Sequence, residues 1–510
     1  MKLFTLVRNL DIIETNIDFT DERENVEITN ISIDSRETGE ADLFICLVGT
    51  KDDGHRHIGA AIERGAAAVI LEYKPVSLDA DTKYMRVLSA RTAESILWSE
   101  WHGNPAEGIK LIGITGTNGK TSVAYMIKKI LDDAGFTTAL FGTIQYIICG
   151  EEHESSMTTY DPKELFALLR EARDKGCEYV VMEISSHSLA LDKLAGLGKI
   201  LLGVFTNLTQ DHLDFHINMK NYMKAKAKLF TMCKIGILNA DDEVSGVIAE
   251  TSASVNYFYS VKGKADFYAR DILYSGTDGL QYKLILQCET DGDSIKETTA
   301  NIKSPMAGGF YVYNTLAAAA AGTLLGVDTH LIERAISEVI IRGRMERLRI
   351  DTPYSVFIDY AHTPDALVNV LRSIRSFSSG NIFAVFGCGG DRDKSKRAVM
   401  GKIASENADF VIITSDNPRS EIPEAIISDI AAGIDKTMCK EFKFTGENSV
   451  DKFPQFITIP DREKAIAFAL GAATPGDVIL LAGKGHETYI RDKSGERHFD
   501  EREIVARLLQ

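Results

Sequence analysis

The chain has 510 residues, which is enough for about three domains of ordinary size. Hydrophobic residues make up 45% of the chain and charged residues 25%, as in most globular proteins. The formal net charge of −16 argues against a general nucleic-acid-binding protein, because such proteins need a basic face. An anionic ligand would therefore depend on local positive charge, such as a lysine, a helix N-terminus or bound Mg²⁺.

The sequence also argues against a secreted or membrane-spanning protein. The apolar run that begins at Met1 is too short for a signal peptide. No apolar stretch approaches the roughly 20 residues that a helix needs to cross a bilayer. The seven cysteines are scattered without a Cys-x-x-Cys pair, which is typical of reduced thiols in the cytosol. We therefore expect a cytoplasmic protein.

Residues 1–103 are predicted to form a small α/β domain. Residues 28–36 alternate like a strand, and residues 42–49 form an apolar one. Residues 57–65 have the pattern of a helix that stops at glycine, before a strand at residues 66–71. The turn residues of 101–108 indicate the first domain boundary.

The most informative stretch begins the second domain, at residues 104–342. An apolar strand (Leu111 to Ile114) runs into Thr115-Gly-Thr-Asn-Gly-Lys-Thr-Ser122 and then into a pattern of helical spacing. A strand, a glycine loop and a helix together cradle a polyphosphate: Lys120 would reach the terminal phosphates and the Thr121 hydroxyl would hold Mg²⁺. Ile114 stands where the strict P-loop pattern has glycine, and an ordinary strand-to-helix turn is the alternative.

The rest of the second domain alternates strands with helices, which predicts a mostly parallel sheet. Later strands are expected at residues 178–184, 200–206 and 235–239, an antiparallel insert at 250–304 and a helix at 313–325. Residues 343–510 repeat the α/β pattern, with strands expected at 354–359, 382–387, 410–414 and 477–483. This third domain should be Rossmann-like, with its site beyond the carboxyl ends of the strands.

Carboxylates and imidazoles follow two strands of the second domain. Glu183 and His187 come after one strand, and Asp211, His212, Asp214 and His216 come after the next. Beside a phosphate loop they suit a divalent cation, although Mg²⁺ prefers oxygen ligands and a lone histidine is more often structural. A helix at residues 222–230 carries three lysines at spacings of two, so at least one of them must turn inward.

Three loops of the third domain carry charged residues just after strands. They contain Arg392, the run Asp416-Asn-Pro-Arg419, and the run Gly483-Lys-Gly-His-Glu487. Arginine binds a carboxylate through two parallel hydrogen bonds and acids bind an ammonium, so together the loops could recognise a zwitterion. Each loop taken alone would be an ordinary turn.

Together these motifs resemble the Mur ligases, over essentially the whole chain. The residues that carry the resemblance are Gly116 to Ser122, Glu183-x-Ser-Ser-His187, Thr206-Asn207 with Asp211-His-Leu-Asp214, Gly343-Arg-Met-Glu-Arg347 and Asp359-Tyr-Ala-His-Thr-Pro-Asp365. The resemblance implies a cytoplasmic enzyme of peptidoglycan synthesis, and so of cell wall biogenesis, cell shape and cell division. It would use ATP and Mg²⁺ to join an amino acid to the D-Glu of UDP-N-acetylmuramoyl-L-alanyl-D-glutamate. It would work as a monomer, without nucleic acid or membrane span.

The resemblance also assigns roles to particular positions. Lys226 matches a carbamylated lysine (N6-carboxylysine), and together with Glu183, His212 and Lys120 it would form the catalytic set. The metal would be held by Thr121, Glu183, His212 and Lys226. ATP would contact Gly116, Thr117, Asn118, Gly119, Lys120, Thr121, Ser122, Asn314, Arg344 and Asp359. The UDP substrate would contact Ser35, Thr158, Thr159, Ser185 and Lys193, and the amino acid Arg392, Asp416, Asn417, Pro418, Arg419, Gly483 and Glu487.

Arg419 carries the expected choice of amino acid. The Asp-Asn-Pro-Arg form resembles ligases that add meso-diaminopimelate, whose side chain ends in a carboxylate that a guanidinium can pair with. A buried unpaired arginine would disfavour L-lysine, the alternative amino acid. Three positions depart from the family pattern and bear on the contacts to UDP and adenine: Tyr311, Leu191 and Lys193.

The expected reaction passes through an acyl phosphate. The D-Glu carboxylate would attack the γ-phosphate of ATP, and the amine would then displace phosphate, at a site shared by the second and third domains. Two other functions share the phosphate loop. Folylpolyglutamate synthetase lacks the dedicated first domain and the Asp-Asn-Pro-Arg loop, and an ATP-hydrolysing regulatory switch has no evident need of a carbamylated Lys226.

Overall fold

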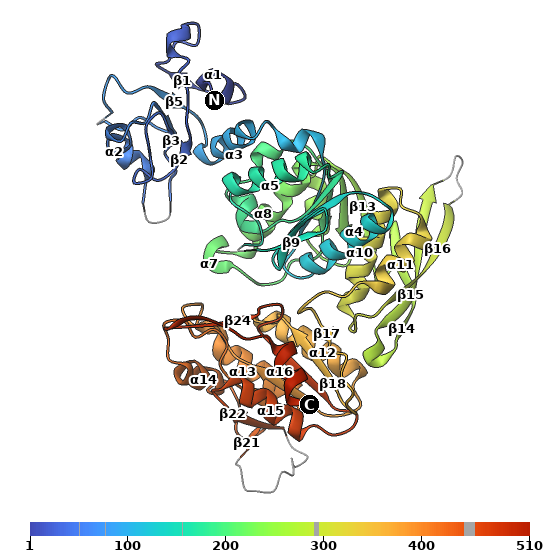
Figure 1. Cartoon of the computed structure of the whole chain (residues 1–510). Coiled ribbons are helices and arrows are strands. Elements are labelled where there is room, and N and C mark those ends of the chain that lie inside the picture. Colours follow the sequence, from blue (N-terminus) through green and yellow to red (C-terminus); the bar gives the residue numbers. More distant parts are fainter. Residues whose placement is uncertain (50–51, 77, 156, 290–294, 443–453) are drawn as a thin grey trace. The chain divides into compact units, whose positions relative to one another are not determined.

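The computed structural model describes residues 1–49, 52–76, 78–155, 157–289, 295–442 and 454–510 (Figure 1). It divides the chain into two compact units. Unit 1 contains Met1–Ala124 and Ala134–Tyr257, and unit 2 contains Tyr125–Asp133 and Phe258–Gln510. Mixed α/β structure with mainly parallel pairing in the large sheets runs through both, as expected from the sequence.

The N-terminal part of unit 1 is a five-stranded sheet in the order β1-β5-β4-β3-β2. Strands β2 to β5 are parallel and β1 pairs with β5 in the antiparallel direction. The elements are α1 (Leu3–Leu6), β1 (Glu14–Thr15), β2 (Ile31–Ser32), β3 (Leu43–Ile45), α2 (Ile58–Glu63), β4 (Ala68–Leu71), β5 (Tyr84–Arg86) and α3 (Ala90–Trp101).

The strand that we predict at residues 28–36 is mostly wrong, because only Ile31 and Ser32 pair with β3. The physical reason is a turn at Asp34. Its carboxylate accepts the backbone N–H of Arg36 at 2.9 Å, which bends the chain out of the sheet. Polar and apolar residues continue to alternate beyond that turn, so the alternation predicts a longer strand than the one that forms.

The larger sheet of unit 1 has the order β12-β11-β6-β10-β7-β8-β9. Its first five strands are parallel, and β7 to β9 form an antiparallel meander that we did not predict. The strands are β6 (Lys110–Thr115), β7 (Thr138–Phe141), β8 (Gln145–Ile148), β9 (Glu151–Glu154), β10 (Tyr179–Glu183), β11 (Ile200–Phe205) and β12 (Cys233–Asn239). The helices are α4 (Lys120–Asp133), α5 (Pro162–Asp174), α6 (Ser186–Ala190), α7 (Leu213–His216), α8 (Met219–Met232) and α9 (Ser245–Thr251). The residues Tyr125–Asp133 of α4 belong to unit 2.

The order of these strands decides what surrounds the phosphate loop. Strand β6 lies between β10 and β11, and both neighbours run parallel to it. Their carboxyl ends therefore reach the same edge of the sheet. The residues after β10 and after β11 flank the loop after β6, which is the arrangement that doubly wound sheets use for ligands.

Most of the insert predicted at residues 250–304 belongs to unit 2, whose second segment begins at Phe258. Strands β14 to β16 pair in the antiparallel direction as expected, whereas β13 and β14 are parallel. Residues 290–294 lie outside the described residues. The elements are β13 (Val255–Ser260), β14 (Phe267–Tyr274), β15 (Leu280–Glu289), β16 (Ile295–Ser304), α10 (Phe310–Leu324) and α11 (Thr329–Glu338).

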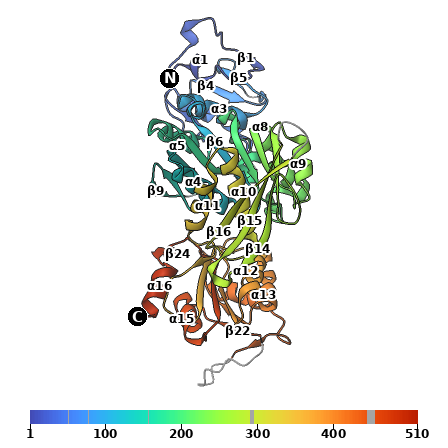
Figure 2. The same ribbon diagram turned by 90° about the vertical axis from the view of Figure 1, so that its right-hand side faces the viewer.

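The C-terminal part of unit 2 is a seven-stranded sheet in the order β17-β18-β23-β19-β20-β22-β21. All its pairs are parallel except that of β17 with β18. Helices α15 and α16 lie on one face of it and α12 and α13 on the other (Figure 2). The strands are β17 (Glu346–Arg347), β18 (Ser355–Asp359), β19 (Ile382–Phe386), β20 (Phe410–Ile413), β21 (Lys440–Glu441), β22 (Gln455–Thr458) and β23 (Val478–Ala482). A separate hairpin, β24 (Tyr489–Asp492) and β25 (Gly495–His498), follows. The helices are α12 (Pro364–Phe377), α13 (Ser395–Asn407), α14 (Pro423–Ala431), α15 (Arg462–Ala472) and α16 (Glu501–Leu508).

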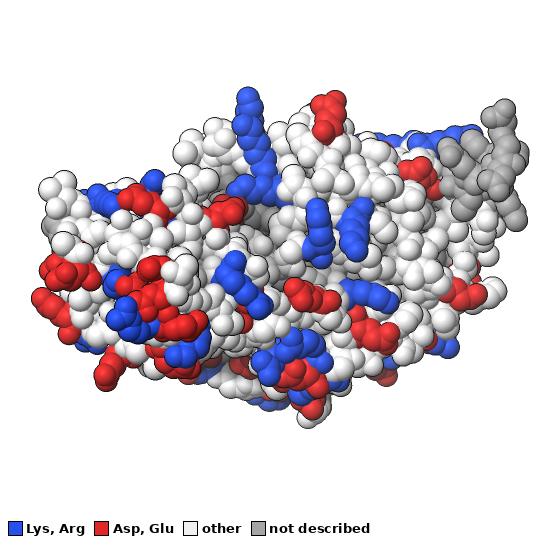
Figure 3. Space-filling view, turned by 90° about the horizontal axis from the view of Figure 1, so that it is seen from above, with Lys and Arg blue, Asp and Glu red and all other residues white. Residues whose placement is uncertain are grey.

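The surface carries charges of both signs. Lysine and arginine side chains are interspersed with aspartate and glutamate on the face shown in Figure 3. Within the described residues, no helix combines the length and apolar character that a membrane crossing requires.

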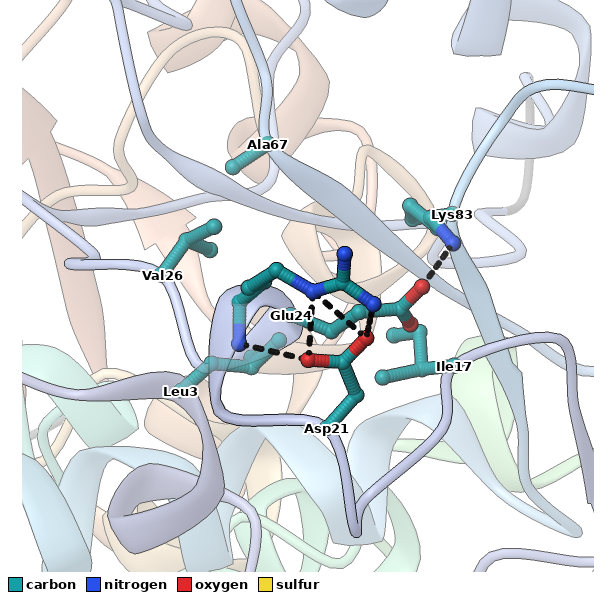
Figure 4. A pocket seen from close by; sticks show the side chains of 8 residues that line it. Leu3, Ile17, Asp21, Glu24, Val26, Ala67 and Lys83 are labelled. Atoms are coloured by element: carbon teal, nitrogen blue, oxygen red, sulfur yellow. Dashed lines mark hydrogen bonds and ion pairs between the residues drawn. The ribbon is translucent and has the colours of Figure 1, made fainter.

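A cavity of about 390 Å³ lies in the N-terminal part of unit 1 (Figure 4). Its walls are partly apolar, and its charged side chains pair with one another: Arg23 with Asp21, and Lys83 with Glu24. None of the residues that we predict as site residues lines it.

Candidate active site

The loop after β6 has the backbone of a phosphate cradle. Gly116 has φ of +149°, and a Cβ at that position would lie 1.8 Å from Thr206 Oγ1. Gly119 also has a positive φ, of +87°, just before α4 begins at Lys120. Because only glycine fits the first position, the tight loop depends on that residue. The loop delivers the N-terminus of α4 to the end of the sheet, where an anion is favoured.

The segment after β11 holds this loop in place. Thr206 Oγ1 donates to the carbonyl oxygen of Asn118 at 2.6 Å. The Asn207 side chain accepts from the Asn118 N–H at 2.9 Å, and its amide donates to the Asn118 carbonyl oxygen at 3.1 Å. Thr206 and Asn207 therefore shape the loop through hydrogen bonds.

Lys120 places its positive charge within the curve of the loop. Its Nζ donates to the carbonyl oxygens of Gly116 at 2.9 Å and Thr117 at 2.8 Å. These two acceptors hold the ammonium beside the loop amides. A terminal phosphate bound by the loop would meet this charge.

Glu183 is a buried carboxylate at the end of β10, only 1% exposed. Its Oε2 accepts the Thr121 hydroxyl at 2.8 Å, and its Oε1 accepts the Thr143 N–H at 2.8 Å. Thr121 Oγ1 and Glu183 are hard oxygen donors next to a phosphate loop. Mg²⁺ commonly binds through one or two such protein oxygens together with substrate phosphates, so this pair fits it.

Lys226 is the lysine of α8 that turns inward, at 1% exposed, which confirms that one of the three does. Its Nζ lies 4.5 Å from the centroid of the Tyr222 ring. Burial lowers the pKa of Lys226 well below its usual value, and the positive charge of Lys120 lowers this pKa further. A buried amine is an unusual use of lysine, which makes Lys226 a candidate functional residue.

His212 follows β11, next in sequence to Asp211. Its backbone is left-handed, with φ of +52°. Its Nε2 is 3.5 Å from Asp211 Oδ2, and its ring meets that of His187 edge to face, at 4.8 Å between centroids. Burial lowers the pKa of His212, the Asp211 carboxylate opposes this change, and the charge of Lys120 lowers the pKa further. Neutral imidazole is the form that binds metals.

The described residues contain no group of three or more His, Cys, Asp or Glu side chains placed to hold a metal ion. Thr121 and Glu183 are hydrogen-bonded to each other, whereas within the described part of the chain neither a hydrogen bond nor an ion pair joins His212 to Glu183. The four-residue metal set of Thr121, Glu183, His212 and Lys226 therefore stays a prediction.

The predicted UDP-substrate residues divide into two places. Thr158 and Thr159 lie beside Glu183: Thr159 Oγ1 donates to the Glu183 carbonyl oxygen at 2.9 Å and accepts the Ser185 N–H at 2.9 Å. Lys193 forms an ion pair with Asp161. Ser35 lies in the turn after β2, in the N-terminal sheet, and no contact recorded for the described residues joins it to the others.

The predicted ATP residues of unit 2 lie on α10 and around β18. Asn314 is a buried residue of α10. The Asp359 carboxylate accepts the backbone N–H groups of Met345 at 2.7 Å and Ala361 at 2.8 Å. Burial raises the pKa of Asp359, although the Arg344 charge opposes the rise. Tyr311, one of the departures from the family pattern, donates to the Arg344 carbonyl oxygen at 2.8 Å.

The three charged loops of the C-terminal sheet follow β19, β20 and β23, which lie side by side and run parallel. Two of them pack closely: the Gly390 N–H donates to the Asn417 carbonyl oxygen at 2.9 Å, and Arg419 Nη1 donates to the Gly390 carbonyl oxygen at 2.7 Å. Asn417 Nδ2 donates to Glu487 Oε2 at 2.8 Å, which adds the third loop. The structure thus brings Asn417, Arg419 and Glu487 together, while Arg392 is exposed.

Sequence reasoning missed three residues of these sites. Thr143 contributes its N–H to Glu183, Tyr222 OH lies 3.1 Å from Thr117 Oγ1, and Lys484 is buried among the charged loops. Thr143 offered no signal, because it follows a strand that we did not predict. Tyr222 lies four residues before Lys226, on the helix that carries the three lysines. Lys484 lies three residues before Glu487, in one of the three charged loops.

Three family models match the chain. These are the Mur ligase family catalytic domain at residues 27–98, the Mur ligase middle domain at 114–322 and the Mur ligase glutamate ligase domain at 343–485. The chain belongs to the Mur ligase family. The domain bounds that we predict, between residues 103 and 104 and between 342 and 343, stay predictions.

Its relatives include several proteins named UDP-N-acetylmuramoyl-L-alanyl-D-glutamate--2,6-diaminopimelate ligase. The one from Clostridium perfringens is 40% identical over the full length of both chains. The one from Caldanaerobacter subterraneus is 42% identical over 95% of both. A solved structure of a ligase with this name has a TM-score of 0.67 and 29% identity and covers 100% of this chain and 98% of its own.

A folylpolyglutamate synthase from Mycobacterium tuberculosis, solved as a complex with ADP, has a TM-score of 0.59 and 18% identity. It covers 77% of this chain and 91% of its own. At that identity the likeness concerns the fold alone.

Proposed function

We propose that the chain is an ATP-dependent ligase that joins meso-2,6-diaminopimelate to the D-Glu carboxyl group of UDP-N-acetylmuramoyl-L-alanyl-D-glutamate. The observation that carries the proposal is full-length identity of about 40% to relatives named for this reaction. The product is a cytoplasmic precursor of peptidoglycan, so the enzyme serves cell wall biogenesis.

The reaction proceeds through two displacements. A D-Glu carboxylate oxygen attacks the γ-phosphorus of ATP, the bond to ADP breaks, and an acyl phosphate forms. The amine nitrogen of diaminopimelate then attacks the acyl carbon, its C–O bond to phosphate breaks, and the amide nitrogen loses a proton to water. Positioning and charge neutralisation supply most of the catalysis.

The phosphate loop and its neighbours act on the first displacement. Lys120 and the loop amides hold the terminal phosphates. Thr121 and Glu183 would hold Mg²⁺ with the phosphate oxygens, and the ion would offset charge on the transferred phosphoryl group. Asn314, Arg344 and Asp359 contribute further contacts to ATP.

Lys226 acts as a carbamate. A neutral amine adds CO₂ and loses a proton, which converts a cation into an anion that can bind a metal. The burial of Lys226 supports this role, because burial favours the neutral amine that reacts with CO₂. His212 completes the set through its neutral imidazole.

For the UDP substrate and the amino acid, we propose contacts with the residues that the sequence predicts. Ser35, Thr158, Thr159, Ser185 and Lys193 hold the UDP substrate. Arg419 pairs with the distal carboxylate of diaminopimelate, and Arg392, Asp416 to Pro418, Gly483 and Glu487 line the rest of the amino-acid pocket.

Phosphate release with each substrate omitted in turn tests the reaction. We expect release only when the UDP substrate, ATP, Mg²⁺ and diaminopimelate are all present, and mass spectrometry should find the amide product. ATP hydrolysis independent of both the amine and the UDP substrate would instead favour a nucleotide-driven switch.

Competition between diaminopimelate and L-lysine tests the choice of amino acid. Wild type should prefer diaminopimelate, and Arg419→Ala should lose roughly 10- to 100-fold of that preference in kcat/KM, because a charge-assisted pair is removed. Equal use of both amino acids by wild type would favour the alternative, L-lysine as a natural substrate.

A further inference from the structure

Lys484 is a fully buried cation among the charged loops of the C-terminal sheet. It follows β23, its side chain is 0% exposed, and neither the reaction nor the pocket residues described above give it a role. Its Nζ lies 3.1 Å from Glu487 Oε2, 3.2 Å from Asn417 Oδ1 and 3.8 Å from Asp416 Oδ1. A charge in such a place is costly unless it is paired, and here it is paired with two carboxylates.

The ammonium determines which way the Asn417 amide faces. Asn417 Oδ1 accepts from Lys484 Nζ and also from the Arg491 N–H at 3.0 Å. With its oxygen turned toward these two donors, Asn417 must present its Nδ2 to Glu487, and it does so at 2.8 Å. Lys484 therefore orients one pocket residue through another.

The same contacts leave one oxygen of Glu487 for a ligand. Both Lys484 Nζ and Asn417 Nδ2 bond to Oε2. Within the part of the chain that the structure describes, no hydrogen bond to Glu487 Oε1 is recorded. A carboxylate held through one oxygen is rigid, and its second oxygen can accept an ammonium.

The charges of the three groups add up to a single negative charge. Asp416 and Glu487 contribute two negative charges and Lys484 one positive charge. That balance suits a single ammonium beside them. Without Lys484 the carboxylates would repel each other and would attract a more cationic ligand.

We propose that Lys484 is a positioning residue that sets both the geometry and the charge of the ammonium-binding side of the amino-acid pocket, so that the pocket accepts a zwitterionic side chain rather than a purely cationic one. This inference rests on the proposed function. It adds a specificity determinant that does not itself touch the reacting atoms.

The test compares Lys484→Met with wild type in the full-length chain. Steady-state phosphate release is measured with diaminopimelate and with L-lysine, at saturating ATP and UDP substrate. We expect the KM for diaminopimelate to rise at least 10-fold, kcat to stay within about 3-fold, and the KM for ATP to be unchanged. The ratio of kcat/KM for L-lysine to that for diaminopimelate should rise at least 3-fold.

Two further variants complete the design. Lys402→Met removes an exposed lysine of α13, whose side chain is 66% exposed, and should leave every constant unchanged. Lys484→Met combined with Glu487→Gln restores the single negative charge and avoids two unpaired carboxylates. It should bring the amino-acid ratio back toward wild type while the KM for diaminopimelate stays high.

The outcomes separate the two proposals. Wild type that releases no phosphate in response to any amino acid contradicts the proposed function. The role of Lys484 is overturned if wild type uses diaminopimelate but Lys484→Met changes neither the KM for diaminopimelate nor the ratio of kcat/KM for L-lysine to that for diaminopimelate. Unfolding of both Lys484 variants in thermal melts would also overturn it, by showing that the residue acts on stability alone.

Discussion

At the scale of single residues, the candidate site contains charged groups that are buried against their usual preference. Glu183 and Lys226 are each 1% exposed, whereas carboxylates and lysines normally stay in water. Hydrogen bonds from Thr121 and Thr143 offset the cost of burying the Glu183 carboxylate. The Lys226 nitrogen lies 4.5 Å from the centroid of the Tyr222 ring.

Removal of the Lys226 amine should abolish ligation. We expect Lys226→Ala to lose at least about 100-fold in kcat, since an electrostatic group of a phosphoryl-transfer site is removed. Addition of bicarbonate to this variant should restore part of the activity. Lys224→Ala, at an exposed position of the same helix, is the matched control and should behave as wild type.

Carbamylation itself can be observed directly. Protein equilibrated with ¹³C-labelled bicarbonate should show a carbamate carbon signal in its NMR spectrum, and Lys226→Ala should lack that signal. A wild-type spectrum without a carbamate signal under turnover conditions would contradict the assignment.

Glu94 on α3 makes the stability of the protein depend on pH. It is 7% exposed, and burial raises its pKa to about 7, with a smaller contribution from Asp161. A carboxyl group whose pKa is raised by folding stabilises the fold fully below its unfolded pKa, and that contribution is lost as the pH rises toward 7. Glu94→Gln should therefore gain stability relative to wild type at pH 8, on the order of 1–3 kcal/mol, and much less at pH 5.

Chemical denaturation at the two pH values measures the effect of Glu94. Glu63→Gln, at an exposed position of α2, serves as the control and should change stability at neither pH. If the free energy of unfolding of Glu94→Gln differs from that of wild type by the same amount at pH 5 and pH 8, burial does not shift the pKa of the Glu94 carboxyl group.

At the scale of elements, the phosphate loop is positioned by strand order. The loop after β6 is flanked by the ends of β10 and β11, which supply Glu183 and Thr206. The close approach of Gly116 to Thr206 is the tightest point of this arrangement. A change there should affect both the stability of the fold and the binding of ATP.

Gly116→Ala tests this packing. The added Cβ would lie 1.8 Å from Thr206 Oγ1, at a φ that residues with side chains rarely adopt. We expect a destabilisation of about 1–3 kcal/mol, seen as a lower Tm, together with a higher KM for ATP. Gly246→Ala, in helix α9 with open space around it, should instead be neutral or stabilising by roughly 0.5–1 kcal/mol.

At the scale of the whole molecule, an acidic protein is proposed to bind two anionic reactants, ATP and the UDP substrate, together with a zwitterionic amino acid. Its net charge is −16, so binding must come from local cations and from loop amides rather than from the overall field. Ligand binding should therefore depend strongly on Mg²⁺, which offsets the charge of the phosphates.

Thermal unfolding with a non-hydrolysable ATP analogue tests this dependence. At a ligand concentration of about 100 times Kd, linkage predicts a stabilisation of about 2.7 kcal/mol and a clear rise in Tm. Removal of Mg²⁺ by a chelator, or the substitution Lys120→Met, should abolish most of the rise. An equal Tm shift in wild type with and without Mg²⁺ would show that the loop binds the nucleotide without the ion.

Much of the fold could be predicted because strands buried on both faces are continuous apolar runs. The predicted strands at β10, β11, β18, β19, β20 and β23 agree with the structure to within about two residues. The meander of β7 to β9 was missed, because β9 is a run of exposed polar residues whose pairing is decided by its neighbours. The strand at residues 28–36 was overextended, because alternation does not reveal the turn at Asp34.

The sequence by itself determined the family, the phosphate loop and the identity of most candidate site residues, because glycines, lysines and carboxylates at these spacings serve few other purposes. Only the tertiary structure decided which side chains meet. The parallel order of β10, β6 and β11 brings Glu183 to Thr121, and that of β23, β19 and β20 brings Lys484 and Glu487, which share one loop, to Asn417. Strand order results from packing between distant segments, and no local pattern of residues encodes it.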